Sequence, residues 1–185
     1  SPSLNYFHNI SMISVLYDDD YSKLNILFDK IYQPKKSNYV YVSYSTSKKE
    51  KYNKKIDIDM DNKTYLKQLI QNTQNIASSH NFNIDPNNYY VEFHKYFVNG
   101  KTIPFTDFHE DDYGAVSYNT VTCIYYLIKN DTIEGGDLEF KNKDKGIIKI
   151  DPNMLVICNG NLVHRVTKMN GSGIRKCIVI QFRRL

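Results

Sequence analysis

Three residues in the second half of the chain have the types and the spacing of a metal site. His109 and Asp111 lie two positions apart, so on a strand both side chains would point to one face and reach one ion. His164 follows much later, after a turn made by Gly160 and Asn161. Two imidazoles and one carboxylate form a facial set that leaves three positions of Fe(II) open. This set predicts a catalytic iron site.

Neighbouring acidic residues leave an alternative for the carboxylate ligand. Asp107 has the same parity as His109 but precedes it, so it is the runner-up ligand. Glu110 and Asp112 do not lie two residues from His109, and we expect them to line the mouth of the site instead.

Motifs around these residues extend the pattern. They are Tyr96 to Gly100 before the H-x-D element, VTCIYYL at 121–127, EGGDL at 134–138, and G-x-R at 173–175. Together with His109, Asp111 and His164, these segments resemble the 2-oxoglutarate/Fe(II) oxygenases, and within them the prolyl 4-hydroxylase-like branch. The resemblance covers about half of the chain. It implies a double-stranded β-helix core and a hydroxylase that uses Fe(II), 2-oxoglutarate and O2, with ascorbate as an optional reductant.

The resemblance also implies a site for 2-oxoglutarate, whose far carboxylate needs a fixed cation. Arg175 suits this role because a guanidinium binds a carboxylate through two parallel hydrogen bonds and stays charged. Lys176 is the alternative, since the apolar run 177–180 does not decide which side chain faces inward. The resemblance assigns Tyr126 a hydrogen bond to the same carboxylate and Tyr96 a contact with the cosubstrate or the pocket wall. Either tyrosine could instead be a core residue.

The remaining pattern predicts an α+β, mainly β fold in one domain over residues 1–185. Up to about residue 88 we expect helical support, with helices from Asp18 to before Pro34 and at about 62–79, and a strand at 39–44. From residue 89 the pattern predicts a jelly-roll or cupin-like double-stranded β-helix against which the helices pack. Its strands are expected at 89–97, 120–128, 137–141, 146–150, 154–158, 164–169 and 175–182.

Composition limits the class of partner. The net charge of +4 is too diffuse for a dedicated nucleic-acid binder, and the one basic cluster, Lys48–Lys55, is typical of a solvated loop. No apolar run approaches the ~20 residues of a membrane span. Cys123, Cys158 and Cys177 lie in apolar runs without paired spacing, which favours reduced thiols. With no leader visible, we expect a cytoplasmic protein.

The favoured substrate is a protein or peptide, hydroxylated at prolyl side chains. A protein lysyl hydroxylase is the closest alternative, because the acidic residues around Asp111 would suit a cationic substrate. A nucleic-acid demethylase on the same fold would use Lys48–Lys55. A non-catalytic β-sandwich binding module would keep the fold without iron or 2-oxoglutarate. The sequence leaves the oligomeric state open.

Overall fold

The computed structural model describes residues 7–10, 18–31, 39–45, 64–111, 120–142 and 146–185. The helices in this part are α1 (Asp18–Ile31) and α2 (Thr64–Ser79). The strands are β1 (Phe7–Ile10), β2 (Tyr39–Ser45), β3 (Ile84–Asn99), β4 (Thr120–Lys129), β5 (Ile133–Gly135), β6 (Leu138–Phe140), β7 (Ile147–Ile148), β8 (Met154–Asn159), β9 (His164–Val166) and β10 (Met169–Arg184).

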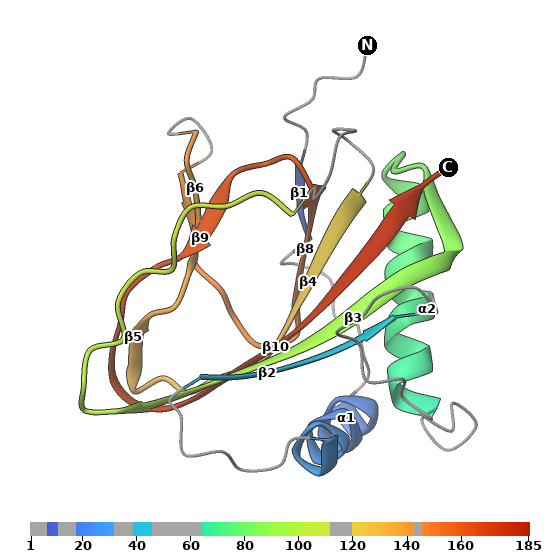
Figure 1. Cartoon of the computed structure of the whole chain (residues 1–185). Coiled ribbons are helices and arrows are strands. Elements are labelled where there is room, and N and C mark those ends of the chain that lie inside the picture. Colours follow the sequence, from blue (N-terminus) through green and yellow to red (C-terminus); the bar gives the residue numbers. More distant parts are fainter. Residues whose placement is uncertain (1–6, 11–17, 32–38, 46–63, 112–119, 143–145) are drawn as a thin grey trace.

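The strands form two antiparallel sheets, and both helices lie on the outer side of the larger one (Figure 1). The larger sheet has the order β1-β8-β4-β10-β3-β2, with β5 paired to the start of β10. The smaller sheet has the order β7-β6-β9. This arrangement confirms the predicted mainly β jelly-roll architecture with helical support. No helix in the described ranges is long and apolar enough to cross a membrane.

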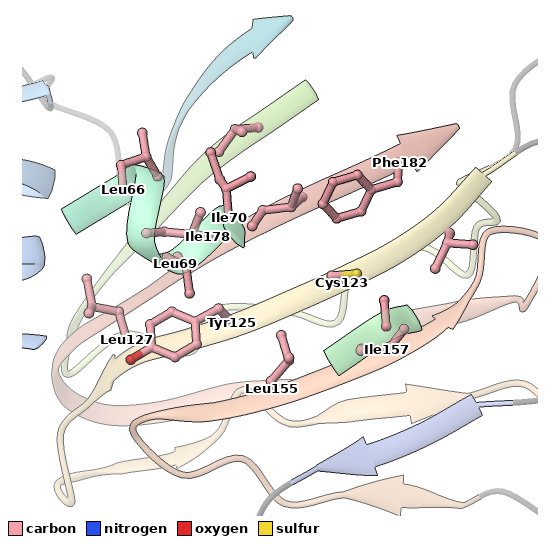
Figure 2. Packing of buried hydrophobic residues seen from close by; sticks show 14 of the residues in the cluster. Leu66, Leu69, Ile70, Cys123, Tyr125, Leu127, Leu155, Ile157, Ile178 and Phe182 are labelled. Atoms are coloured by element: carbon pink, nitrogen blue, oxygen red, sulfur yellow. The ribbon is translucent and has the colours of Figure 1, made fainter. Parts of the chain in front are cut away.

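Helix α2 forms because apolar residues recur on one of its faces, and this face is buried against the larger sheet. Leu66, Leu69 and Ile70 pack over Ile178 and Phe182 of β10 (Figure 2). Both predicted helices are confirmed, although the predicted start of the second one and the end signal of the first lie outside the described residues.

The central strand β4 is buried on both sides, which explains its nearly continuous apolar sequence. Cys123 and Tyr125 face the helices, where Figure 2 shows them beneath α2. Ile124 and Tyr126 point the other way, toward the smaller sheet. Each face of the larger sheet therefore has its own apolar layer.

Strand β10 runs between β3 and β4 and sets the alignment of the site. Arg175 is opposite Tyr96 of β3, while Gln181 is opposite Thr122 of β4. Side chains alternate along a strand, so every second residue from Arg175 to Gln181 points to the same face of the sheet. This inner face lies toward the smaller sheet and lines the cavity described below. The residues of the other parity point toward the helices.

The structure corrects three details of the predicted strands. The stretch 164–169, predicted as one strand, belongs to two strands, since β9 ends at Val166 and β10 begins at Met169. Strands β1 and β5 were not predicted, because each is too short for alternation to be visible. The segment with His109 and Asp111 is not a regular strand, and it joins its neighbours through the isolated bridges Ile103–Met169 and His109–His164 and through single backbone hydrogen bonds.

Candidate active site

The three predicted metal ligands lie together between the two sheets. Their ligand atoms are all within 4.8 Å of one another. Asp111 is central, since Oδ1 lies 3.7 Å from His109 Nε2 and Oδ2 lies 3.5 Å from His164 Nε2. The two histidines face each other because their backbones pair, with N to O distances of 3.0 and 2.9 Å in the two directions. An irregular segment thus does what the predicted strand was expected to do.

Hydrogen bonds on the far side of each ring fix which nitrogen faces the cluster. His109 Nδ1 lies 2.9 Å from the carbonyl oxygen of Asp107, and His164 Nδ1 lies 2.8 Å from that of Leu162. A carbonyl only accepts, so each Nδ1 must carry the proton and donate it. Both Nε2 lone pairs are then available to an ion, an arrangement found at metal-bound histidines. Asp107 contributes its carbonyl here, and its carboxylate is not in the cluster.

The Asp111 carboxylate is buried and held by a residue that the sequence did not suggest. Thr122 Oγ1 donates a 2.9 Å hydrogen bond to Oδ2, and the Asp111 backbone N–H donates to the Gly160 carbonyl oxygen at 2.7 Å. Thr122 shares the parity of Ile124 and Tyr126 on β4, which in retrospect was the signal for an inward-facing hydroxyl. These hydrogen bonds fix the position of Asp111 and the orientation of its carboxylate.

The donor set fits a divalent first-row metal. Two imidazole nitrogens and a carboxylate on one side of a cavity are the ligands of non-haem Fe(II) sites. A buried carboxylate is unfavourable without a compensating positive charge, which an ion between Asp111, His109 and His164 would provide. Metal bonds of about 2.0–2.2 Å at right angles hold ligand atoms ~3 Å apart, so the observed 3.5 and 3.7 Å separations require small adjustments.

A cavity of about 180 Å³ adjoins the cluster, and Arg175 lines one end of it. The Arg175 side chain is fully enclosed, with 2% relative exposure. Its Nε donates to the Gly136 carbonyl oxygen at 2.8 Å, and its guanidinium carbon lies 5.5 and 5.6 Å from the centres of the Tyr96 and Tyr126 rings. Among the described residues, no carboxylate forms an ion pair with it. A buried cation in this setting favours an anionic ligand.

Lys176, the alternative cation, points to the opposite face of β10. Its ammonium group donates to Asn25 Oδ1 at 2.8 Å and to Asp29 Oδ1 at 2.7 Å, both on α1. Burial lowers the pKa of Lys176 although Asp29 opposes this shift. The side chain ties helix α1 to the sheet and does not reach the cavity.

Tyr126 is buried in the cavity wall, and its burial raises the pKa of the phenol well above its usual value although the Arg175 charge opposes this. Burial likewise raises the pKa of Tyr96. Both phenols therefore remain protonated and able to donate a hydrogen bond. Neither tyrosine is only a core residue, since both line the cavity as well.

Gly136 does more than complete a turn. Its φ is +72°, and a Cβ at this position would lie 3.0 Å from Cδ of Arg175 and 3.0 Å from the sulfur of Met169. The absence of a side chain lets the Arg175 guanidinium approach the Gly136 carbonyl oxygen. Glycine at this position is thus required by the cation beside it.

The rest of the cavity wall combines apolar side chains from four strands with polar side chains on β3 and β10. Ile124, Leu138, Val166 and Val179 form the apolar part. Glu92, His94 and Gln181 form the polar part. His94 Nε2 lies 2.8 Å from Glu92 Oε2.

The remaining predictions concern the acidic residues near the cluster, the basic cluster and the cysteines. Glu110 is exposed beside the cluster, as expected for a residue at the mouth. Asp112 and the basic cluster Lys48–Lys55 lie outside the described ranges. All three cysteines are buried and unpaired, as predicted.

Comparisons by sequence find no relatives, since no protein-family model matches this chain and no curated protein matches it. Comparisons by structure find many, over nearly the whole chain. A viral collagen prolyl hydroxylase from Paramecium bursaria Chlorella virus-1, in complex with 2-oxoglutarate, matches with a TM-score of 0.62 and 17% identity over 97% of this chain and 97% of its own.

Two further matches come from bacteria and animals. A 2OG-Fe(II) oxygenase family oxidoreductase from Burkholderia pseudomallei has a TM-score of 0.68 and 9% identity over 96% of this chain and 84% of its own. A prolyl hydroxylase from Trichoplax adhaerens, in complex with a hypoxia inducible factor peptide fragment, has a TM-score of 0.61 and 16% identity over 96% and 83%. The fold of this chain is therefore the double-stranded β-helix of the 2-oxoglutarate/Fe(II) oxygenases.

Proposed function

We propose that this chain is a protein prolyl hydroxylase that uses Fe(II), 2-oxoglutarate and O2. The observation that carries the proposal is Arg175, a buried guanidinium without a carboxylate partner among the described residues, in the cavity that holds His109, Asp111 and His164. A metal cluster and a fixed cation in one small cavity match the two ends of 2-oxoglutarate. The 2-oxo acid end suits the metal and the far carboxylate suits Arg175.

Each group in the cavity then has a role in binding. His109, Asp111 and His164 would hold Fe(II), which with 2-oxoglutarate and O2 supplies the oxidising chemistry for an unactivated C–H bond. Arg175 holds the cosubstrate carboxylate, and Tyr126, whose raised pKa keeps its phenol protonated, can donate a further hydrogen bond. No side chain is needed as a general base.

Water exclusion is the second contribution of the protein. Leu138 and Val166 come from the smaller sheet, and Ile124 and Val179 come from the larger one, so apolar groups cover the cavity from both sides. A dry site strengthens the ion pair at Arg175 and protects reactive species from side reactions. The β-helix thus supplies positioning and enclosure rather than acid–base chemistry.

The choice of a prolyl substrate is supported by the structural neighbours. Two of the three are prolyl hydroxylases, one named for collagen and one bound to a peptide fragment. A peptide in extended conformation could bring one side chain to the metal while its backbone stays outside the cavity. The substrate of this chain is therefore proposed to be a protein or peptide.

Anaerobic titration with Fe(II) and 2-oxoglutarate tests the function. The parent chain should develop the visible charge-transfer band of the chelated metal, and its aerobic reaction should release succinate and add one oxygen atom to proline peptides. Asp111→Ala should abolish the band. Asp107→Asn is the matched control, because its carboxylate is outside the cluster, and it should keep the band. A folded parent chain without the band would contradict the proposal.

A further inference from the structure

A hydrogen-bonded carboxylate lies in the cavity wall, and the proposed reaction does not use it. Glu92 projects inward from β3, and its side chain is only 12% exposed. Tyr90 donates its phenolic hydrogen to Oε1 at 2.5 Å, and His94 Nε2 lies 2.8 Å from Oε2. Both oxygens are therefore held in place, so the carboxylate keeps one orientation toward the cavity. A group that is merely solvated would not need this support.

The sheet register puts Glu92 at the end of the cavity away from Arg175. Glu92 pairs with Val179 of β10, which lies four residues beyond Arg175, or roughly 13 Å along the strand. Val179 in turn pairs with Ile124 of β4, two residues from Thr122, which holds the Asp111 carboxylate. Thr122 itself is level with Gln181 and Tyr90, so Glu92 lies across the width of β10 and two residues along the sheet from it. Glu92 and the metal ligands line the same cavity.

Charge completes the argument. When Fe(II) and 2-oxoglutarate are bound, their charges and those of Asp111 and Arg175 cancel. Glu92 is the other carboxylate, besides Asp111, among the described residues that line the cavity. An apolar substrate would remove water from this carboxylate without replacing its hydrogen bonds, which is unfavourable. A substrate cation would replace them with charge-assisted ones, since a carboxylate can accept about four hydrogen bonds.

We propose that Glu92 selects substrates that carry an ammonium or guanidinium group beside the hydroxylated carbon. This inference rests on the proposed hydroxylase function and narrows its substrate class. The cation has two possible sources, a basic residue adjacent to the target proline or a target lysine itself. Tyr90 and His94 act as positioning residues for the carboxylate.

The test uses the parent chain loaded anaerobically with Mn(II) and 2-oxoglutarate, so that peptide binding is measured without turnover. Three peptides share one sequence around a proline and differ at its neighbour, which is lysine, norleucine or glutamate. A fourth peptide replaces the proline by lysine. Aerobic reactions with Fe(II), followed by mass spectrometry, then show which residue gains oxygen and so distinguish the two sources of the cation.

We expect the parent chain to bind the lysine-flanked peptide about tenfold or more tightly than the norleucine peptide. Glu92→Gln should remove this preference while the affinities for Mn(II) and 2-oxoglutarate stay as in the parent. Glu92→Lys should reverse it in favour of the glutamate peptide. Glu134→Gln is the matched control, because Glu134 is exposed on β5 outside the cavity, and it should keep the parent preference.

Two results would overturn the inference. One is an unchanged charge preference in a folded Glu92→Gln variant that still binds metal and 2-oxoglutarate. The other is a preference that disappears in Glu110→Gln instead, which would assign the cation to the exposed mouth of the site. The inference alone fails if the parent chain binds 2-oxoglutarate but binds the lysine, norleucine and glutamate peptides with equal affinity. If the parent shows no 2-oxoglutarate band, the proposed function fails as well.

Discussion

Thr122→Val should weaken metal binding without disturbing the fold. The Thr122 hydroxyl donates at 2.9 Å to the Asp111 carboxylate, and the two residues are 1% and 8% exposed. Water therefore has little access to replace the lost donor. A hydrogen bond to a charged group contributes about 1.5–3 kcal/mol. This corresponds to a roughly 10–100-fold weaker metal affinity, the range typical of groups that support a metal ligand.

Valine is the informative replacement because it keeps the branched shape that suits β4 and removes only the hydroxyl. Anaerobic titration with Co(II), followed by its visible absorption, measures the dissociation constant directly. Thermal unfolding of the metal-free variant checks that the fold is retained. We expect the dissociation constant to rise while the spectrum of the bound ion keeps its coordination type.

Thr120→Val provides the matched control. Thr120 is also buried on β4, but no hydrogen bond joins its side chain to Asp111, so this variant should bind Co(II) like the parent. If Thr122→Val binds Co(II) with parental affinity, the reasoning fails. The orientation of the carboxylate would then depend on the backbone bond to Gly160 alone.

Four further substitutions test other parts of the site. Arg175→Met should raise the KM for 2-oxoglutarate at least about tenfold in steady-state kinetics, whereas Lys176→Met should leave this KM unchanged. Lys176→Met should instead lower the free energy of unfolding by about 1 kcal/mol, because Lys176 forms hydrogen bonds to α1. Gly136→Ala should lower both Tm and 2-oxoglutarate affinity, because a side chain is strained at a φ of +72° and its Cβ would lie 3.0 Å from Arg175 Cδ. Parental values of both would contradict this. Burial raises the pKa of Tyr126, so above pH 10.0 an unfolded tyrosine loses its proton while the folded one keeps it, and stability falls as pH rises. Tyr126→Phe should reduce that fall in urea unfolding between about pH 9 and 11, and an unchanged slope would refute the assignment.

Much of the site could be predicted from the sequence because its chemistry depends on residue types that few other roles require. Two histidines and one aspartate at H-x-D spacing predicted the metal cluster, and the G-x-R spacing favoured the cation that lines the cavity. Helical periodicity predicted α1 and α2, and short β-rich runs predicted most of the larger sheet. These signals are local, so they can be read along the chain.

Other parts depended on contacts between distant segments. The choice between Arg175 and Lys176 depends on which side chains of β10 face the cavity. Pairing with β3 and β4 decides this. The apolar sequence that follows does not alternate, so it gives no indication of which side chains face inward. Thr122 is an ordinary β-strand residue until Asp111 is folded against it. Glu92 reads as a solvent-facing residue, and only the sheet register brings it into the cavity.

The sequence by itself thus determined which chemistry the chain could support, because ligands and charged groups are identified by residue type. Tertiary structure decided which of these groups face one another. An irregular segment held by the His109–His164 bridge completes the metal cluster without the predicted strand. Side-chain direction in such a segment depends on long-range hydrogen bonds and packing, and no local periodicity records them.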